Sequence, residues 1–384
     1  MTDANRPFGV LVLPQTYPPD VGGVETHLAD LTEAFQKQTG WKIWIVSYKP
    51  IVTEVEHYLS REARGPVRIR RFWWFGGNLF RKLEPFPPLM FLYIVPYFMV
   101  RLFFYMAAKM RDVDVIHVHG INMAFVGWIF GALFRKRVVF QSHALYSFKQ
   151  GSLFSRVAAF LLKRMDAVIV LCNASKREFA RLGLPPERIA VYRYWIDLAR
   201  FNAAGRPRPS GFTAFFVGRL IGIKGEGLVI DLARRFPQIK FRLAGGGPNQ
   251  QAVIDAARRA DNLEYLGLVP NDRLHEYYRQ ADVTLVPSQY PEGFGRVICE
   301  SLACGTPVIA SNIGGIPDAM DETVGVLCEL NIDSFAQALQ RMLNEPGWYA
   351  SLQANCRAYA ERQFSENNAK AIFSAYLADA SSHS

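Results

Sequence analysis

Residues 288–318 read SQYPEGFGRVICESLACGTPVIASNIGGIPD. The apolar run Val283–Val286 precedes them and predicts a buried strand. A glycine-rich loop that carries Glu292 comes next, followed by a short helix that carries Glu300 and stops at a Gly-Thr-Pro tripeptide. A second strand is predicted over residues 308–310. Strand, loop, helix and strand in this order predict a βαβ unit.

The loop and the start of the helix carry groups that a nucleotide sugar requires. Exposed backbone amides around residues 294–296 suit an anion such as a diphosphate. Glu292 and Glu300 can accept hydrogen bonds from polyhydroxylated rings on either side of it. The alternative is ordinary surface chemistry, with Arg296 and Glu300 as a helix-surface ion pair and Glu292 as a solvated loop charge.

As a whole, the stretch resembles the donor-binding segment of the retaining GT-B glycosyltransferases of family GT4. In that family two glutamates separated by seven residues flank a Gly-Phe-Gly and are followed by Gly-Thr-Pro-Val and Gly-Gly-Ile-Pro, as they are in this sequence. The resemblance implies that Glu300 holds the ribose hydroxyls of the donor. It also implies that Glu292 holds the sugar hydroxyls together with the amides of Gly293, Phe294 and Gly295.

Length and composition fit two globular domains. The chain has 384 residues, half of them apolar, so each half is long enough to bury its own core. Its five cysteines are scattered without a Cys-x-x-Cys pair, which predicts neither a disulfide framework nor a zinc site and favours the cytoplasm. The N-terminus lacks the basic and apolar regions of a signal peptide. All of the net charge of +10 lies in residues 1–200, which favours an anionic partner surface.

Two glycines separate the first predicted strand, 8–13, from the first predicted helix. Gly22 and Gly23 stand just before apolar residues at helical spacing that begin with Val24. Glycine at a helix start allows an anion to approach the backbone closely, and the alternative is a plain turn. The resemblance implies that Gly22 and Gly23 face the donor diphosphate and the reacting sugar, and we take Glu25 as a candidate acceptor contact.

Three histidines stand near the carboxyl ends of predicted strands. His117 and His119 end one strand and His143 follows another, which is where ligands bind in open α/β sheets. Two histidines at i and i+2 could form one side of a metal site. No acidic residue or cysteine stands nearby at the spacing of metal ligands, so we predict no metal. A structural role is the alternative for each. The resemblance implies that His143 lies by the transferred sugar, and His119 is a candidate acceptor contact.

Residues 72–110 are unusually apolar and aromatic. The charge-free run over 85–100 contains Pro96 and falls short of the roughly 20 residues that a spanning helix needs. Its aromatic residues and basic flanks suit a helix that lies in a membrane interface, and the alternative is a buried helix of the N-terminal domain. Together with the uneven charge, this segment favours peripheral contact with an anionic membrane surface.

The second half begins after a proline- and glycine-rich linker, residues 200–210, with a strand predicted over 214–217. Arg219 and Lys224 follow it in a glycine-containing loop, where both can reach a diphosphate, although loop cations are usually just solvated. The resemblance implies that they hold the leaving nucleotide diphosphate. One departure from the family is Tyr194-Trp195, which replaces the usual Asn-Gly and leaves open how this edge of the site contacts a ligand.

Alternating strands and helices in both halves predict an α/β protein with two Rossmann-like, doubly wound parallel sheets facing a cleft. We place the acceptor-binding domain at residues 1–200 and the nucleotide-sugar-binding domain at 201–366. In GT-B folds a final helix crosses back onto the first domain, and the helical periodicity near the C-terminus places that helix in residues 367–384.

The function we expect is transfer of a sugar from a nucleotide diphosphate sugar to a membrane-borne or saccharide acceptor, in polysaccharide or glycolipid biosynthesis. Arg219 and Lys224 would stabilise the departing diphosphate in place of a metal, with Glu292 and His143 at the sugar and with no cofactor. Retention of anomeric configuration follows from the resemblance only. We expect the enzyme on the cytoplasmic face of a membrane.

Two alternatives remain open from the sequence. A nucleotide-sugar epimerase on the same scaffold would need no acceptor. The basic half would also suit a nucleic-acid-binding protein, but no helix-turn-helix or base-stacking motif supports that function, and we expect no nucleic-acid partner.

Overall fold

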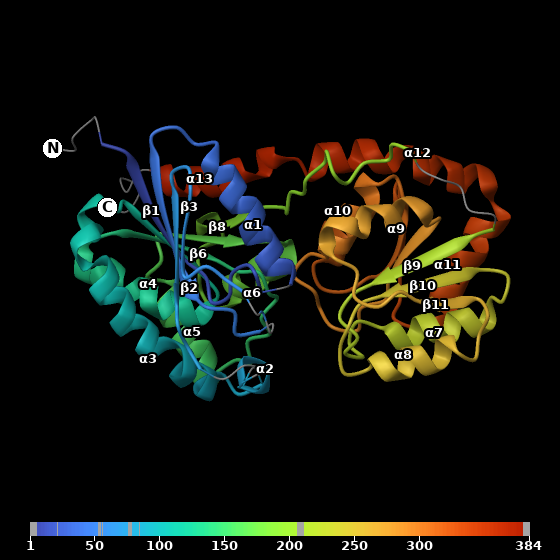
Figure 1. The fold of residues 1–384 in the computed structure, drawn as a ribbon, viewed down its shortest axis with the longest axis horizontal. Coiled ribbons are helices and arrows are strands. Elements are labelled where there is room, and N and C mark those ends of the chain that lie inside the picture. The colour runs from blue at the N-terminus through green and yellow to red at the C-terminus, as the bar shows by residue number, and fades with distance from the viewer. Residues whose placement is uncertain are drawn as a thin grey trace. The chain divides into compact units, whose positions relative to one another are not determined.

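The structure, a computed structural model, describes residues 6–20, 22–52, 55, 57–75, 79–83, 85–205 and 211–378. The chain divides into two compact units. Unit 1 comprises residues 1–192 and 368–384, and unit 2 comprises residues 193–367. Both are α/β units built on a parallel sheet, so the predicted fold class is confirmed (Figure 1).

Unit 1 has an eight-stranded sheet in the order β3-β4-β2-β1-β5-β6-β7-β8. All neighbouring strands are parallel except β3 and β4, which form an antiparallel hairpin at one edge. The strands are β1 (Phe8–Leu13), β2 (Trp41–Tyr48), β3 (Arg61–Arg64), β4 (Val67–Phe72), β5 (Val115–His119), β6 (Arg137–Gln141), β7 (Ala167–Val170) and β8 (Ile189–Val191).

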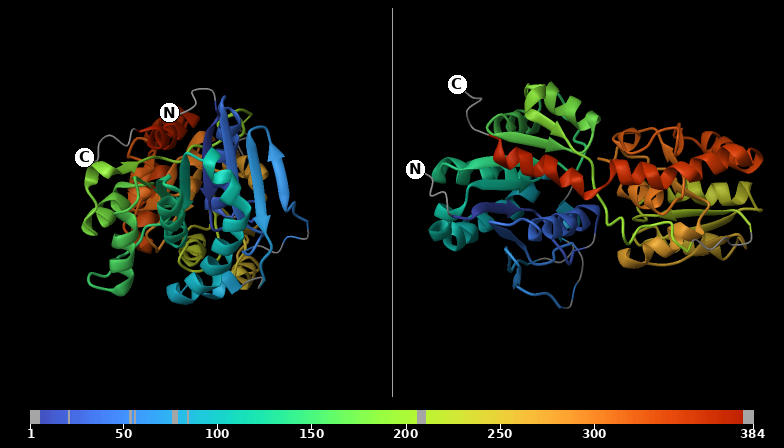
Figure 2. Two further views of the ribbon diagram at one scale, coloured as in Figure 1. Left: turned by 90° about the vertical axis from the view of Figure 1, so that its left-hand side faces the viewer. Right: turned by 90° about the horizontal axis from the view of Figure 1, so that it is seen from above.

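Helices cover both faces of this sheet. They are α1 (Gly23–Gln36), α2 (Leu79–Leu83), α3 (Pro87–Met106), α4 (Ile121–Phe134), α5 (Leu153–Leu162), α6 (Asn173–Arg181) and α13 (Ala369–Leu377). The alternation of a strand directs Trp44 into the core shared with α3 and α4, while Trp41 packs against Phe35 of α1 and Tyr376 of α13. The last helix, α13, lies against the unit 1 sheet beside β6 (Figure 2). Arg137 of β6 donates to the carbonyl of Ala375 in that helix.

Helix α3 differs from the sequence expectation, because it runs through Pro96 for 20 residues. A proline inside a helix removes one backbone hydrogen bond, and burial of one face of α3, including Ile94 and Phe98, offsets that cost. The opposite face leaves Leu92 and Phe104 exposed. By length and composition alone the segment Pro88–Asp112 is apolar enough to cross a membrane, a test that core helices of soluble proteins also pass. The helix is therefore half core and half surface.

Unit 2 has a six-stranded, wholly parallel sheet in the order β11-β10-β9-β12-β13-β14. Its strands are β9 (Thr213–Val217), β10 (Lys240–Ala244), β11 (Leu263–Tyr265), β12 (Val283–Val286), β13 (Val308–Ser311) and β14 (Gly325–Cys328). Its helices are α7 (Glu226–Arg235), α8 (Gln250–Ala257), α9 (Leu274–Gln280), α10 (Arg296–Ala303), α11 (Ile332–Asn344) and α12 (Pro346–Gln363).

Strand order locates the ligand edge of each unit. Counted within unit 2, the order is 3-2-1-4-5-6, which is the order of Rossmann folds. Its switch point lies between β9 and β12, and the parallel strands of unit 1 have a corresponding switch between β1 and β5. Ligands bind outside the carboxyl ends of strands at such a point. The loops that follow β9 and β12 are the ones that carry Lys224 and Glu292.

Candidate active site

Lys224 and Glu292 meet at the switch point of unit 2. The Nζ atom of Lys224 lies 2.8 Å from Oε1 of Glu292, and both side chains are partly exposed. The next residue, Gly225, has φ of 85° and packs tightly on the loop after β12, because a Cβ there would lie 2.0 Å from the carbonyl oxygen of Pro287. The structure therefore brings together one predicted phosphate ligand and one predicted sugar ligand.

Arg219 lies in the same loop, just after the end of β9. Its side chain is exposed, and no ion pair joins it to another described residue. The loop thus carries two cations, of which one is neutralised by Glu292. An anion that binds here would meet a net positive charge.

Glu226 organises this loop and was missed from the sequence. Its Oε1 accepts from the amide of Gly222 at 2.5 Å and from Nδ2 of Asn249 at 2.7 Å, which ties the loop after β9 to the loop after β10. Its Oε2 is buried without a hydrogen-bond partner. The only signal in the sequence was an acidic residue directly after Lys-Gly. Glutamate is common in the first turn of helices, so this residue did not indicate a role in the loop.

The Gly-Gly-Ile-Pro motif holds the backbone of Glu292. Gly314 has φ of 63°, and a Cβ there would lie 2.8 Å from both the nitrogen and the oxygen of Glu292. The amide of Gly315 donates to the carbonyl of Glu292 at 2.8 Å. The Ser288 hydroxyl donates to the Glu292 carboxylate. Residues from two sequence motifs that stand about 20 residues apart thus hold the backbone and the carboxylate of Glu292 in place.

Glu300 lies in α10 and points into the protein. Its Oε1 accepts from Nε of Arg296 at 3.0 Å and from Asn271 at 3.4 Å, and its Oε2 accepts from the Tyr278 hydroxyl at 2.9 Å. The predicted Arg296–Glu300 pair forms but is buried, with 9% and 3% of the side chains exposed, so it is not a surface pair. Burial and the nearby Glu300 carboxylate raise the pKa of Tyr278 well above its usual value. The ribose role of Glu300 stays a prediction.

The helix that follows the glycine loop begins at Arg296. Gly295 caps it with φ of 91°, a conformation that favours glycine. Phe294 is buried and meets the ring of Tyr194 edge-on, with centroids 5.8 Å apart. Tyr194 and Trp195, which replace the family's Asn-Gly, are both buried. This substitution therefore supports the loop of Gly293 and Phe294 by packing.

In unit 1, Gly22 and Gly23 start α1, and Glu25 lies in its first turn. A Cβ at Gly22 would lie 2.3 Å from Oε2 of Glu25, and the Thr16 hydroxyl donates to Oε1 of Glu25. Glu25 is buried, which is unusual for a predicted acceptor contact. The extended backbone of Gly22, with φ of 172°, needs no glycine for its torsion, and an added Cβ would meet only the carboxylate end of the Glu25 side chain.

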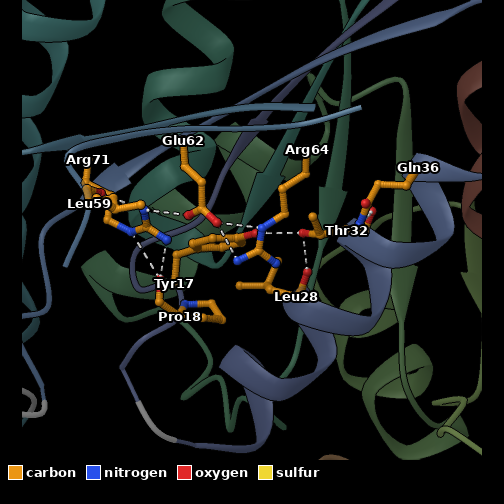
Figure 3. Close-up of polar contacts among 9 residues, drawn as sticks. All are labelled: Tyr17, Pro18, Leu28, Thr32, Gln36, Leu59, Glu62, Arg64 and Arg71. Atoms are coloured by element: carbon orange, nitrogen blue, oxygen red, sulfur yellow. Dashed lines mark hydrogen bonds and ion pairs between the residues drawn. The ribbon is translucent and has the colours of Figure 1, made fainter. Parts of the chain in front are cut away.

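The loop before Gly22 is anchored by a buried cation. Arg71 donates to the carbonyl of Pro18 at 2.7 Å and 3.1 Å, and to the carbonyl of Leu59 at 2.8 Å (Figure 3). Asp20 accepts from the amides of Ile51 and Val52. The edge hairpin and the loop after β2 therefore fix the segment that leads into α1.

Four histidines gather on the face of the unit 1 sheet that α1 and α13 cover. Nδ1 of His119 lies 2.8 Å from Nε2 of His143, and Nδ1 of His117 lies 2.7 Å from the Tyr376 hydroxyl. His27 of α1 lies 5.2 Å from His143 between ring centroids. Desolvation lowers the pKa of His117 and His143 to about 3, and burial and the neighbouring imidazoles lower the pKa of His119 well below its usual value. His119 and His143, for which separate roles were expected from the sequence, are in contact, and their lowered pKa values keep both imidazoles neutral.

Within the part of the chain that the structure describes, no group of three or more His, Cys, Asp or Glu side chains is arranged to hold a metal ion. Metal-independent chemistry stays a prediction. All five cysteines are buried, and none of them forms a disulfide bond.

Two α/β units, each with a parallel sheet whose strand order reverses at a switch point, are the architecture of the GT-B class. Residues 201–363 match the model of the glycosyl transferases group 1, and residues 21–200 match that of Glycosyltransferase Family 4. The chain belongs to this glycosyltransferase family and is a hexosyltransferase-type enzyme.

Known proteins agree with this assignment. One subunit of the phosphatidylinositol N-acetylglucosaminyltransferase of Arabidopsis thaliana is 26% identical over 352 residues, which cover 87% of this chain and 74% of that protein. The sucrose-phosphate synthase of Thermosynechococcus elongatus matches with a TM-score of 0.79 at 22% identity, over 96% of this chain and 98% of that one. Anabaena HepE in complex with UDP matches with a TM-score of 0.72 at 21% identity, over 96% and 100%.

Proposed function

We propose that this enzyme is a retaining glycosyltransferase that moves a hexosyl group from a UDP-sugar to a membrane-borne acceptor in glycolipid or polysaccharide assembly. The observation that carries the donor part is the Lys224–Glu292 contact at the switch point of unit 2. The UDP complex of HepE, which has the same fold, supports uridine as the nucleotide.

The donor would bind with its diphosphate at the loop after β9 and at the start of α10. Arg219 and Lys224 supply the charge, and backbone amides near Gly295 add donors. The sugar would lie by Glu292, whose carboxylate accepts hydrogen bonds from hydroxyl groups. Glu226 would position Lys224 and Arg219 by holding the amide of Gly222.

The reaction breaks the bond between the anomeric carbon and the diphosphate oxygen and forms a bond from that carbon to an acceptor oxygen. Negative charge grows on the departing diphosphate, and fixed cations stabilise it there. The acceptor hydroxyl loses its proton to that leaving oxygen, so no separate base is assigned. His143 and His119, both neutral, would hydrogen-bond to sugar or acceptor hydroxyls.

Two observations support a membrane-borne acceptor. The Arabidopsis relative is named for phosphatidylinositol, which is a membrane lipid. Unit 1 exposes a set of large apolar side chains on α3 and α5, two helices that both contact α4. They are Leu89, Leu92, Val100, Phe103, Phe104, Leu153, Phe154, Val157 and Phe160. Large exposed apolar patches mark sites of partner or membrane contact, and we propose peripheral attachment at the cytoplasmic face.

A panel of UDP-, GDP- and ADP-sugars, scored by the rise in melting temperature, tests the donor. UDP-sugars alone should raise it, by mass action. Proton NMR of the product, formed from an α-linked donor, tests the stereochemistry, and an α-linked product is expected. Free sugar-nucleotide turnover with no glycoside would favour the epimerase alternative. Retention on nucleic acid with no response to any nucleotide sugar would favour the nucleic-acid alternative.

A further inference from the structure

Three arginines gather where the edge hairpin of unit 1 meets α3. In the antiparallel pairing of β3 and β4, Arg61 lies directly opposite Arg70. Cross-strand partners point to the same face of a sheet, and like charges in that position repel each other. The pair is therefore unfavourable in the protein alone.

Arg101 of α3 joins this pair at a shared aromatic ring. Its guanidinium carbon lies 5.3 Å from the ring centroid of Phe72 and 5.7 Å from that of Tyr97. The guanidinium carbon of Arg70 lies 6.0 Å from the same Phe72 ring. Partial burial and the charge of Arg61 lower the pKa of Arg70, with a further contribution from Arg101. Three cations thus lie close enough to repel one another.

Within the described part of the chain, the hydrogen-bonding capacity of these arginines is largely unused. Nε of Arg70 is buried without a partner there, and its Nη1 makes a long contact of 3.5 Å with the carbonyl of Ser60. Guanidinium groups hold phosphate oxygens through pairs of N–H donors. An oxyanion placed between the three side chains would use these donors and relieve the repulsion.

No described carboxylate neutralises the cluster. Glu62, the acidic residue of β3, points to the other face of the hairpin, where it contacts Arg64 and Arg71 (Figure 3). Asp112 pairs with Lys42. The sequence of α3 itself, residues 87–106, contains no acidic residue. Among the residues that the structure describes, Arg61, Arg70 and Arg101 form no ion pair.

Exposed apolar side chains flank the cluster. Val100 precedes Arg101 and is 57% exposed, and Phe104, one turn later in α3, is 80% exposed. A small phosphorylated metabolite would make no contact with these apolar side chains. A bilayer would contact both sets of residues, because its phosphates lie next to its acyl chains.

We propose that Arg61, Arg70 and Arg101 bind the phosphate of an anionic lipid headgroup, with Val100 and Phe104 entering the acyl boundary beside it. This site would hold unit 1 against the membrane in one orientation. It deepens the membrane part of the proposed function and rests on it, although it does not depend on which sugar is transferred.

The test compares binding of the full chain to phosphatidylcholine vesicles with and without phosphatidylglycerol. The variant is Arg61→Gln with Arg70→Gln, and the matched control is Arg258→Gln with Arg259→Gln in unit 2, which removes the same charge from exposed residues. Each arginine is worth about fivefold in membrane affinity, so the variant should bind anionic vesicles about 25-fold more weakly. The control should match the wild type. Equal binding by variant and control would overturn the site.

Two further measurements separate the possible outcomes. Phe104→Ser should weaken vesicle binding without changing the response to inorganic phosphate. If inorganic phosphate raises the melting temperature of the wild type but not of the arginine variant, and no protein binds vesicles, the site takes a free phosphate compound and the lipid proposal is wrong. The UDP-sugar response, measured on the same variants without vesicles, should be unchanged. Its absence from every protein would overturn the proposed function while leaving the vesicle result to judge the arginine site.

Discussion

Lys224 donates to Glu292 across 2.8 Å, joining the loop that follows β9 to the loop that follows β12. These two strands are neighbours in the sheet although about 70 residues separate them, because the chain reverses its strand order there. In the structure without a ligand, the predicted phosphate ligand and the predicted sugar ligand thus neutralise each other. A donor that places phosphate at Lys224 and hydroxyls at Glu292 would replace that contact at both ends.

Lys224→Ala should weaken donor binding about 10- to 100-fold, the usual value of one hydrogen bond to a charged group. The measurement is the UDP-dependent rise in melting temperature, titrated to give an affinity. Lys240→Ala is the matched control, because Lys240 forms a similar contact of 2.9 Å with Glu264 at the start of β10. Loss of affinity in both variants, or in neither, would contradict the assignment of Lys224.

Gly225→Ala should abolish donor binding and lower stability. The residue has φ of 85°, and the added Cβ would lie 2.0 Å from the backbone of Pro287, which cannot move aside cheaply. Gly227→Ala is the control two residues further on, where a Cβ meets nothing within 4 Å. Inside α7 that change should keep binding and add up to about 1 kcal/mol to the free energy of unfolding. Calorimetric titration with UDP and urea unfolding measure the two effects.

Glu300→Gln should reduce the free energy of unfolding by about 3–5 kcal/mol, because it leaves the Arg296 guanidinium without its charge partner in a buried site. The matched control is Glu345→Gln. Arg341 and Glu345 have the same i, i+4 spacing and the same distance of 3.0 Å, but both side chains are about half exposed. Urea unfolding should detect less than about 1 kcal/mol there.

The same pair decides how Glu300 activity data are interpreted. If Glu300→Gln is as stable as the control, the buried pair is not structural and a direct ribose role gains support. If it is destabilised as expected, any loss of transfer must be compared at temperatures where both proteins are folded.

Most of the sheet could be predicted from the sequence because its strands are buried. Runs such as Phe8–Leu13 and Val283–Val286 are continuously apolar, as strands covered on both faces are, and the structure has strands with these bounds. The loops that carry Lys224 and Glu292 were also predictable, because tight backbone contacts require glycine at Gly225 and Gly314. These signals are local in sequence.

The remaining features depend on tertiary contacts that local patterns do not contain. Tyr376 reaches His117 over 2.7 Å from a helix that is 259 residues away in sequence, and helical periodicity cannot say which strand that helix meets. Pro96 argued for a break in α3, and the packing of Ile94 and Phe98 in the core overrode it. In the sequence, Glu226 looks like an ordinary acidic residue in the first turn of a helix. Only its contacts with Gly222 and Asn249 show that it connects two loops.

The lowered pKa values of His117 and His143 predict that stability falls in mild acid. Because the folded pKa of His117 and His143 is about 3, below the unfolded value of about 6.5, both stay neutral in the fold while the unfolded chain takes up protons. Their contribution is complete above pH 6.5 and is lost as the pH falls from there towards 3. The slope should reach about 1.4 kcal/mol per pH unit for each histidine.

Urea unfolding between about pH 7 and pH 5 measures this slope. His143→Gln should show a shallower slope than wild type, while His57→Gln, at an exposed residue, should not; parallel slopes in all three proteins would mean that His143 is not held neutral.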